Sequence, residues 1–271
     1  MSDAPGWRQD PRVPDQLRWW DGVGWTPHVV QRVPATKPPP PPHPTLPLVV
    51  AVGALVTILS SLVASRFVLR WLVRYHWPIA AYVLVAAVLG YGPVIAFAVR
   101  SSRRWGTGRL RDDTGVHFRK IDAVWGPVTW LSCFAAQIAL GIIVLLLNIP
   151  LKSNTEGIGK LRADRGYVIA LLVVAVLVAP IVEEIVFRGL VLRGLLSRMG
   201  AVPAVMVQAV LFGSAHIDPV RGAGNIGLVI VLSGVGGVLG GSEYLLRRLG
   251  PTMLAHGILN AVALTIVLIV S

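Results

Sequence analysis

Long apolar runs follow one another along almost the whole chain from residue 46 onward. A helix needs about 20 predominantly apolar residues to cross the roughly 30 Å hydrocarbon core of a bilayer. Only 14% of the residues are charged, whereas a soluble domain usually has about a quarter. The sequence therefore predicts an all-α polytopic membrane protein with about seven transmembrane helices, at 46–65, 78–99, 123–148, 167–187, 201–217, 226–246 and 252–270.

The basic residues indicate how the helices are oriented. The formal net charge is +12, but the Arg and Lys residues lie in short segments between apolar runs, which disfavours a nucleic-acid partner. The positive-inside rule places the strongly basic segment 100–120 in the cytoplasm, and with it the N-terminus and the 189–200 connection. We expect a multi-pass protein of the plasma membrane. No cleavable signal peptide is expected, because the first apolar run follows a long polar region.

The polar N-terminal region divides into two parts. Residues 1–32 combine clustered tryptophans with Gly and Asp-Gly turn signals, which predicts a very small strand-and-turn module. Residues 33–47 contain eight prolines and are expected to form an extended polyproline II linker. The membrane part is then divided into 48–120, with the first transmembrane helices and the basic loop, and a core at 121–271.

Ionisable residues in the apolar runs are costly in lipid and are therefore functional candidates. Glu184 and Arg188 are four residues apart on one helix, so they share a face and can neutralise one another. An ion pair that makes their burial tolerable is about as good an explanation as a catalytic role. Glu183 is rotated by about 100° from Glu184 and points elsewhere. No charge on its own helix explains Glu183, which makes it a candidate for chemistry.

Two histidines also lie in apolar runs. His216 shares a helix face with Phe212, and His256 shares one with Asn260, at i, i+4 spacing in both cases. Alone, either histidine would be explained as a hydrogen-bonded structural residue. Together with Glu183 they supply the imidazole, carboxylate and amide groups that activate water and stabilise an oxyanion.

Three motifs in this order, Glu183-Glu184-x-x-x-Arg188, Phe212-x-x-x-His216 and His256-x-x-x-Asn260, resemble the CAAX protease and bacteriocin-processing family (CPBP, also Abi) of intramembrane peptidases. The resemblance covers roughly residues 120–271. It implies that Glu183 activates water with help from His216, that His256 and Asn260 stabilise the tetrahedral intermediate, and that three further residues support the site: Glu184, Arg188 and Phe212. The N-terminal module resembles a short Trp-rich domain of unknown function.

The cofactor requirement stays open at this point. Glu183, His216 and His256 offer the donor types of a zinc site, whereas a buried glutamate can also serve as general base without metal. The sequence has no His-Glu-x-x-His motif that would favour a metalloendopeptidase. We lean toward metal-free chemistry.

The leading hypothesis for function is an intramembrane protease, a hydrolase that cuts a membrane-associated or lipidated substrate. One alternative is a non-catalytic immunity or scaffold protein on the same fold, and another is a transporter, although no inverted repeat supports the latter. Membrane lipid is an expected partner, and the Trp-rich module is a candidate for binding a protein. The Gly-rich stretch 233–241 predicts close helix packing.

Overall fold

The computed structural model describes residues 4–31, 45–155 and 158–270. These residues form two compact units, which divide within the Pro-rich region. The predicted linker at 33–47 lies outside the described residues except for its last three positions. Each unit is described by itself below.

The N-terminal unit is a three-stranded antiparallel sheet of β1 (Gly6–Gln9), β2 (Gln16–Trp20) and β3 (Trp25–Gln31) in the order β1-β2-β3. Trp7 lies opposite Trp19 in the register of β1 and β2, and their rings meet edge to face with centroids 5.4 Å apart. Aromatic cross-strand pairs of this kind stabilise small sheets that have little core. The predicted strand-and-turn module is confirmed.

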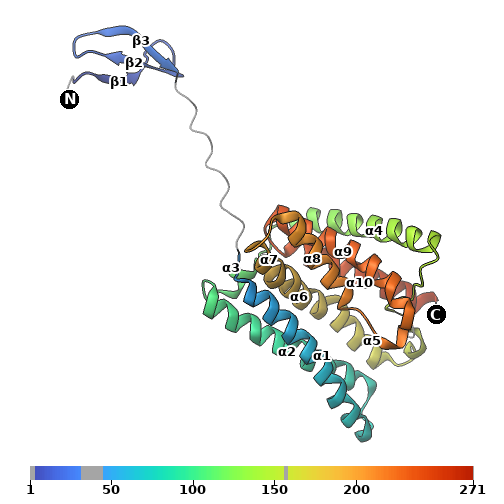
Figure 1. Ribbon diagram of the computed structural model, residues 1–271. Coiled ribbons are helices and arrows are strands. Elements are labelled where there is room, and N and C mark those ends of the chain that lie inside the picture. The colour runs from blue at the N-terminus through green and yellow to red at the C-terminus, as the bar shows by residue number, and fades with distance from the viewer. Residues whose placement is uncertain (1–3, 32–44, 156–157, 271) are drawn as a thin grey trace. The chain divides into compact units, whose positions relative to one another are not determined.

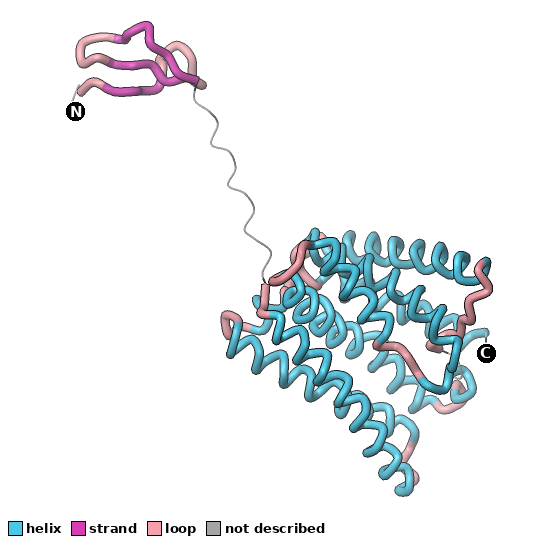
Figure 2. Tube along the Cα trace, viewed as in Figure 1, coloured by secondary structure: helices cyan, strands magenta, loops and turns pink. Residues whose placement is uncertain are grey.

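The second unit is helical throughout (Figures 1 and 2). Prolines and glycines set several of its helix ends: α2, for example, begins after Pro78 and ends just before Gly106. The elements are α1 (Leu48–Leu72), η1 (Val73–Tyr75), α2 (Ile79–Trp105), α3 (Leu110–Thr114), α4 (Asp122–Leu146), η2 (Ile158–Leu161), α5 (Arg165–Leu172), η3 (Val173–Val178), α6 (Ala179–Glu184), η4 (Ile185–Leu192), α7 (Arg193–Leu196), α8 (Ala201–Ser214), η5 (Pro219–Gly224), α9 (Asn225–Leu246) and α10 (Gly250–Val270).

Six helical segments among the described residues are long and apolar enough to cross a membrane. This agrees with the expected count of about seven to within one, and the difference is the run at 201–217, which forms only the 14-residue α8. At about 1.5 Å per residue, α8 is roughly 21 Å long and shorter than a hydrocarbon core of about 30 Å. The six segments are Leu48–Tyr75, Ile79–Trp105, Asp122–Leu146, Arg165–Leu196, Pro219–Leu246 and Gly250–Val270.

The fourth of these segments, Arg165–Leu196, is a continuous helix whose register changes twice. Its parts η3 and η4 are π-helical, and the short α6 lies between them. π-helical turns are rare and occur often at functional sites. Against this central helix pack α1, α2, α8 and α10, so residues distant in sequence surround it.

Helices α8 and α9 approach each other closely, as the Gly-rich stretch predicted. A Cβ atom on Gly213 would lie 2.6 Å from the carbonyl oxygen of Val229, and one on Gly236 would lie 3.1 Å from the backbone of Ala209. Only glycine fits such a separation of helix backbones. The small residues therefore bring α8, which ends just before His216, close to α9.

Buried ion pairs join the helix ends near α7. Arg193, which the sequence placed in a loop, is part of α7 and fully buried. Its guanidinium lies 2.9 Å from Glu243 and donates to the carbonyl oxygen of Asp113 at 2.8 Å. Gly115 lies against this guanidinium with φ +79°, where a Cβ atom would collide with Arg193. The segment around α3 is thus fixed to the helical bundle.

Candidate active site

The two adjacent glutamates of α6 lie in different surroundings, as the helical geometry predicted. Glu184 is fully buried, whereas 15% of the Glu183 side chain is exposed. The π-helical segments before and after α6 change the register on both sides of the pair. A single turn of helix thus carries one enclosed carboxylate and one accessible carboxylate.

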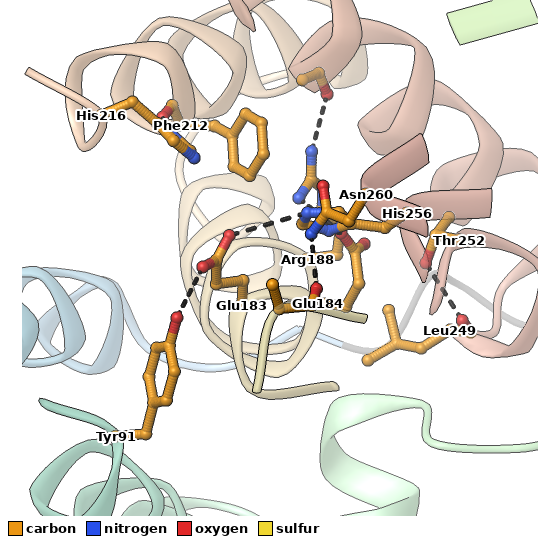
Figure 3. Close-up of polar contacts among 12 residues, drawn as sticks. Tyr91, Glu183, Glu184, Arg188, Phe212, His216, Leu249, Thr252, His256 and Asn260 are labelled. Carbon is orange, nitrogen blue, oxygen red and sulfur yellow. Dashed lines mark hydrogen bonds and ion pairs between the residues drawn. The ribbon is translucent and has the colours of Figure 1, made fainter. Parts of the chain in front are cut away.

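Glu184 and Arg188 form the expected i, i+4 ion pair, with Arg188 Nη1 2.8 Å from Glu184 Oε1 (Figure 3). The other guanidinium nitrogen, Nη2, donates to the carbonyl oxygen of Gly236 at 3.2 Å. The guanidinium also lies over the ring of Phe212, 4.4 Å from its centroid. These contacts provide the partners that a charge needs away from water.

His256 of α10 connects the two glutamates. Its Nδ1 is 2.9 Å from Glu184 Oε1, and its Nε2 is 3.8 Å from Glu183 Oε2. A carboxylate accepts, so Nδ1 carries the hydrogen of the shorter contact. Glu184 therefore fixes the orientation of the imidazole and directs Nε2 toward Glu183.

Glu183 has a second partner that the sequence analysis missed. The hydroxyl of Tyr91, on α2, donates to Glu183 Oε1 at 2.9 Å. The two residues are 92 positions apart, and a tyrosine in an apolar run carries no sign of what its hydroxyl contacts. Figure 3 shows Glu183 between Tyr91 on one side and His256 on the other.

His216 follows directly after α8 and is oriented by its own helix. Its Nδ1 is 2.9 Å from the carbonyl oxygen of Phe212, which can only accept, so Nδ1 is the protonated nitrogen. In the neutral imidazole, Nε2 then has a free lone pair. Phe212 lies between the two histidines, with ring centroids 5.0 Å from His216 and 5.8 Å from His256. The aromatic ring separates the imidazoles and packs against both.

Asn260 has a structural partner on η3. Its Nδ2 donates to the carbonyl oxygen of Ala175 at 2.7 Å. In a π-helix this carbonyl would pair with the backbone nitrogen five residues later, which belongs to Pro180 and has no hydrogen. Asn260 thus supplies the donor that Pro180 lacks. The second hydrogen of the Asn260 amide remains for another acceptor.

The lengths of two helices explain how His216 reaches the level of the glutamates. The central helix continues for 13 residues from Glu183 to Leu196, about 20 Å, and the chain then returns through 15 residues from Ala201 to His216, about 22 Å. The 189–205 connection is thus a helical hairpin. The segment after His216 is irregular as well, with a kink at Gly222 in η5.

The donor set does not fit a zinc centre. Among the described residues, no three or more His, Cys, Asp or Glu side chains are grouped so that they could hold a metal ion. Nδ1 of His256 is engaged with Glu184, and its Nε2 is the nitrogen that faces Glu183. We therefore derive no chemical step through a metal.

The fold and the arrangement of these polar groups define a class: a polytopic helical membrane protein with a carboxylate and histidine site among its helices. Residues 165–262 match the family model described as type II CAAX prenyl endopeptidase Rce1-like, and this match confirms the resemblance stated from the three motifs. The family that this segment resembles is described as an endopeptidase, and the six long apolar helical segments support a multi-pass membrane protein.

The family model matches a shorter segment of the chain than the segment of roughly residues 120–271 to which the motifs pointed. It contains the segments with Glu183, His216, His256 and Asn260, but it leaves out α2 and therefore Tyr91. Residues 5–44 match a second model, described only as a protein of unknown function (DUF2510). No curated protein and no solved structure matches the chain.

Proposed function

We propose that this protein hydrolyses a peptide bond of a membrane-associated or lipidated substrate, with Glu183 as the general base that activates water. One observation supports this choice above the others. The Glu183 carboxylate is partly accessible and lies between Tyr91 and His256, whereas Glu184 is enclosed and paired with Arg188. The accessible glutamate is the one that a water molecule and a substrate can reach.

In this mechanism Glu183 takes a proton from water, and the resulting hydroxide attacks the carbonyl carbon of the peptide bond. His216 accepts a hydrogen bond from the same water through Nε2 and orients it. When the tetrahedral intermediate collapses, the C–N bond breaks. Glu183 then gives its proton to the leaving amine, which restores the carboxylate.

Two groups stabilise the negative oxygen of the intermediate. His256 donates through Nε2 in its doubly protonated form, while Glu184 holds Nδ1. Asn260 donates its second amide hydrogen, because the first is engaged by Ala175. Donors that are already fixed before the reaction stabilise an oxyanion most effectively.

An apolar groove near the site supports a substrate with an apolar part. The groove has a volume of about 300 Å³ and lies between the central helix and α10, which also carry Glu183 and His256. Its lining includes Val176, Pro180, Met253 and Gly257. An apolar part of a substrate bound in lipid would find apolar side chains in this groove.

The test is cleavage by the full chain in lipid nanodiscs, using otherwise identical fluorogenic peptides with and without a C-terminal lipid. Replacement of a general base typically lowers the rate by about 100-fold or more, so we expect that loss for Glu183→Gln. His216→Ala should also lose activity, whereas His117→Ala, in a loop outside the site, serves as the matched control. Normal cleavage by Glu183→Gln would overturn the mechanism, and full biological function without cleavage would favour a scaffold.

We also infer that the protein resides in the plasma membrane with the Trp-rich module in the cytoplasm. The basic residues at the end of α2, Arg100, Arg103 and Arg104, support this orientation. A cytoplasmic module is then available for a protein partner, while the helices contact membrane lipid. Protease accessibility of a tag placed before the module, in intact and in opened cells, tests the orientation.

A further inference from the structure

We propose that Tyr91 of α2 is a positioning residue for the reaction: its hydroxyl holds the Glu183 carboxylate in the orientation that activates water. This inference rests on the proposed function and extends it to a helix outside residues 165–262. The site would then be completed by the α1–α2 hairpin, which the matched family segment does not contain.

The contact joins two elements that are packed side by side. Helix α2 packs against α5, α6, η3 and η4, which are successive parts of the central helix. From α2, the Tyr91 hydroxyl lies 2.9 Å from Glu183 Oε1 and points at the carboxylate in Figure 3. Pro93, two residues later, removes a backbone hydrogen bond in this part of α2. The tyrosine thus extends from a locally interrupted turn toward the site.

The two carboxylate oxygens of Glu183 face different partners. Oε1 accepts from Tyr91, and Oε2 faces Nε2 of His256 at 3.8 Å. A carboxylate with one oxygen held in this way cannot rotate freely about its last torsion. The lone pairs needed for proton abstraction therefore keep a fixed direction, which is the condition for an efficient general base.

The Tyr91 hydroxyl donates to a carboxylate, and a hydrogen bond to such a charged acceptor is stronger than one between neutral groups. The other charged or titratable groups around Glu183 are His256 from α10, His216 after α8, and Glu184 and Arg188 on the same helix. Removal of the Tyr91 hydroxyl leaves all of these in place. Tyr91→Phe removes one hydrogen-bond donor and changes the volume of the side chain very little.

The chain offers a matched control on the same helix. Tyr82 is also on α2, but its hydroxyl accepts from the backbone nitrogen of Trp77 and donates to the carbonyl oxygen of Leu72. Tyr82→Phe therefore removes a tyrosine hydroxyl from α2 without touching Glu183. Any general effect of losing such a group on the helix appears in both variants, and the effect on the base appears only in Tyr91→Phe.

The experiment compares full-length wild type, Tyr91→Phe, Tyr82→Phe and Glu183→Gln in nanodiscs. Loss of one hydrogen bond to a charged group corresponds to about 10- to 100-fold in rate, so kcat of Tyr91→Phe should fall by that factor with KM unchanged. Tyr82→Phe should match wild type in kcat and KM.

A spectroscopic measurement tests the contact independently of turnover. With 3-fluorotyrosine at position 91, the fluorine resonance should differ between wild type and Glu183→Gln, because the acceptor changes. If cleavage needs Glu183 but Tyr91→Phe has normal kcat, the role of Tyr91 is refuted and the proposed function stands. If Glu183→Gln cleaves normally, both fail. An identical fluorine resonance in the two proteins refutes the contact itself.

Discussion

The pair Glu184 and Arg188 allows a quantitative test of what holds the site together. Both side chains are fully buried, and the pair distance is 2.8 Å. Removing one partner of a buried pair leaves an uncompensated charge and costs about 3–5 kcal/mol. We therefore expect that Arg188→Met, which preserves much of the side-chain volume, lowers the free energy of unfolding by about this amount.

Glu184→Gln should be at least as damaging as Arg188→Met. Without Arg188, Glu184 still has His256 at 2.9 Å. Without the Glu184 carboxylate, the guanidinium loses its nearest anion and keeps the carbonyl of Gly236 and the ring of Phe212 at the distances given above. A lone guanidinium in a membrane interior costs about 3 kcal/mol even on the mildest scales.

The assay is a double-mutant cycle in detergent, with thermal unfolding followed by circular dichroism. For a unit of this size, about 1 kcal/mol corresponds to roughly 2–4 °C in Tm, so each single variant should melt about 6–20 °C lower. The decrease in Tm of the double variant Glu184→Gln/Arg188→Met should be smaller than the sum of the decreases of the two single variants, because the double variant contains neither of the two charges. Additive losses, or single losses below about 1 kcal/mol, would refute the reasoning, since contacting residues couple by about 0.5–3 kcal/mol.

Three further predictions follow from the site and the N-terminal module. A zinc chelator should leave the cleavage rate unchanged, because the donors are not grouped around a metal position; inhibition that added zinc reverses would contradict this. Asn260→Ala should lower the Tm by roughly 2–4 °C through loss of the Ala175 contact, about 1 kcal/mol, and should also lower kcat, whereas a purely structural amide would leave kcat intact. In the module, the backbone N–H of Arg12, followed by Arg18 and Gln16, lowers the pKa of Asp10 to about 2. A folded-state pKa below the ordinary 3.8 stabilises the module above that pH and loses the effect as the pH falls toward 2; tryptophan fluorescence should show this loss in wild type and not in Asp10→Asn.

Local helical geometry was sufficient to predict those features of the site that depend on a single helix. The i, i+4 rule predicted the contact between Glu184 and Arg188, and a rotation of about 100° per residue predicted the separate direction of Glu183. Apolar runs predicted the class of fold and most of its helices. The expected number of spans agrees with the six candidate spans to within one, and the difference is α8, which is apolar but short.

The missed features depend on register and on long-range packing. Tyr91 meets Glu183 across 92 residues, and no periodicity in either segment indicates that contact. The π-helical register around α6 is also invisible in the sequence, because Val, Leu and Ala fit α and π turns alike. Without knowledge of this π-helical register, the sequence gives no reason for the hydrogen bond from Asn260 to the Ala175 carbonyl.

Pro180 relates the change of register to the site. It stands three residues before Glu183 and leaves carbonyl groups of the preceding turn without their backbone donors. In lipid such groups must find partners within the protein, and Asn260 of α10 provides one for Ala175. The same face of α10 carries His256, one helical turn earlier, against Glu184. The need to satisfy one backbone carbonyl therefore fixes α10 along the central helix, and this placement sets His256 Nε2 opposite the accessible carboxylate of Glu183.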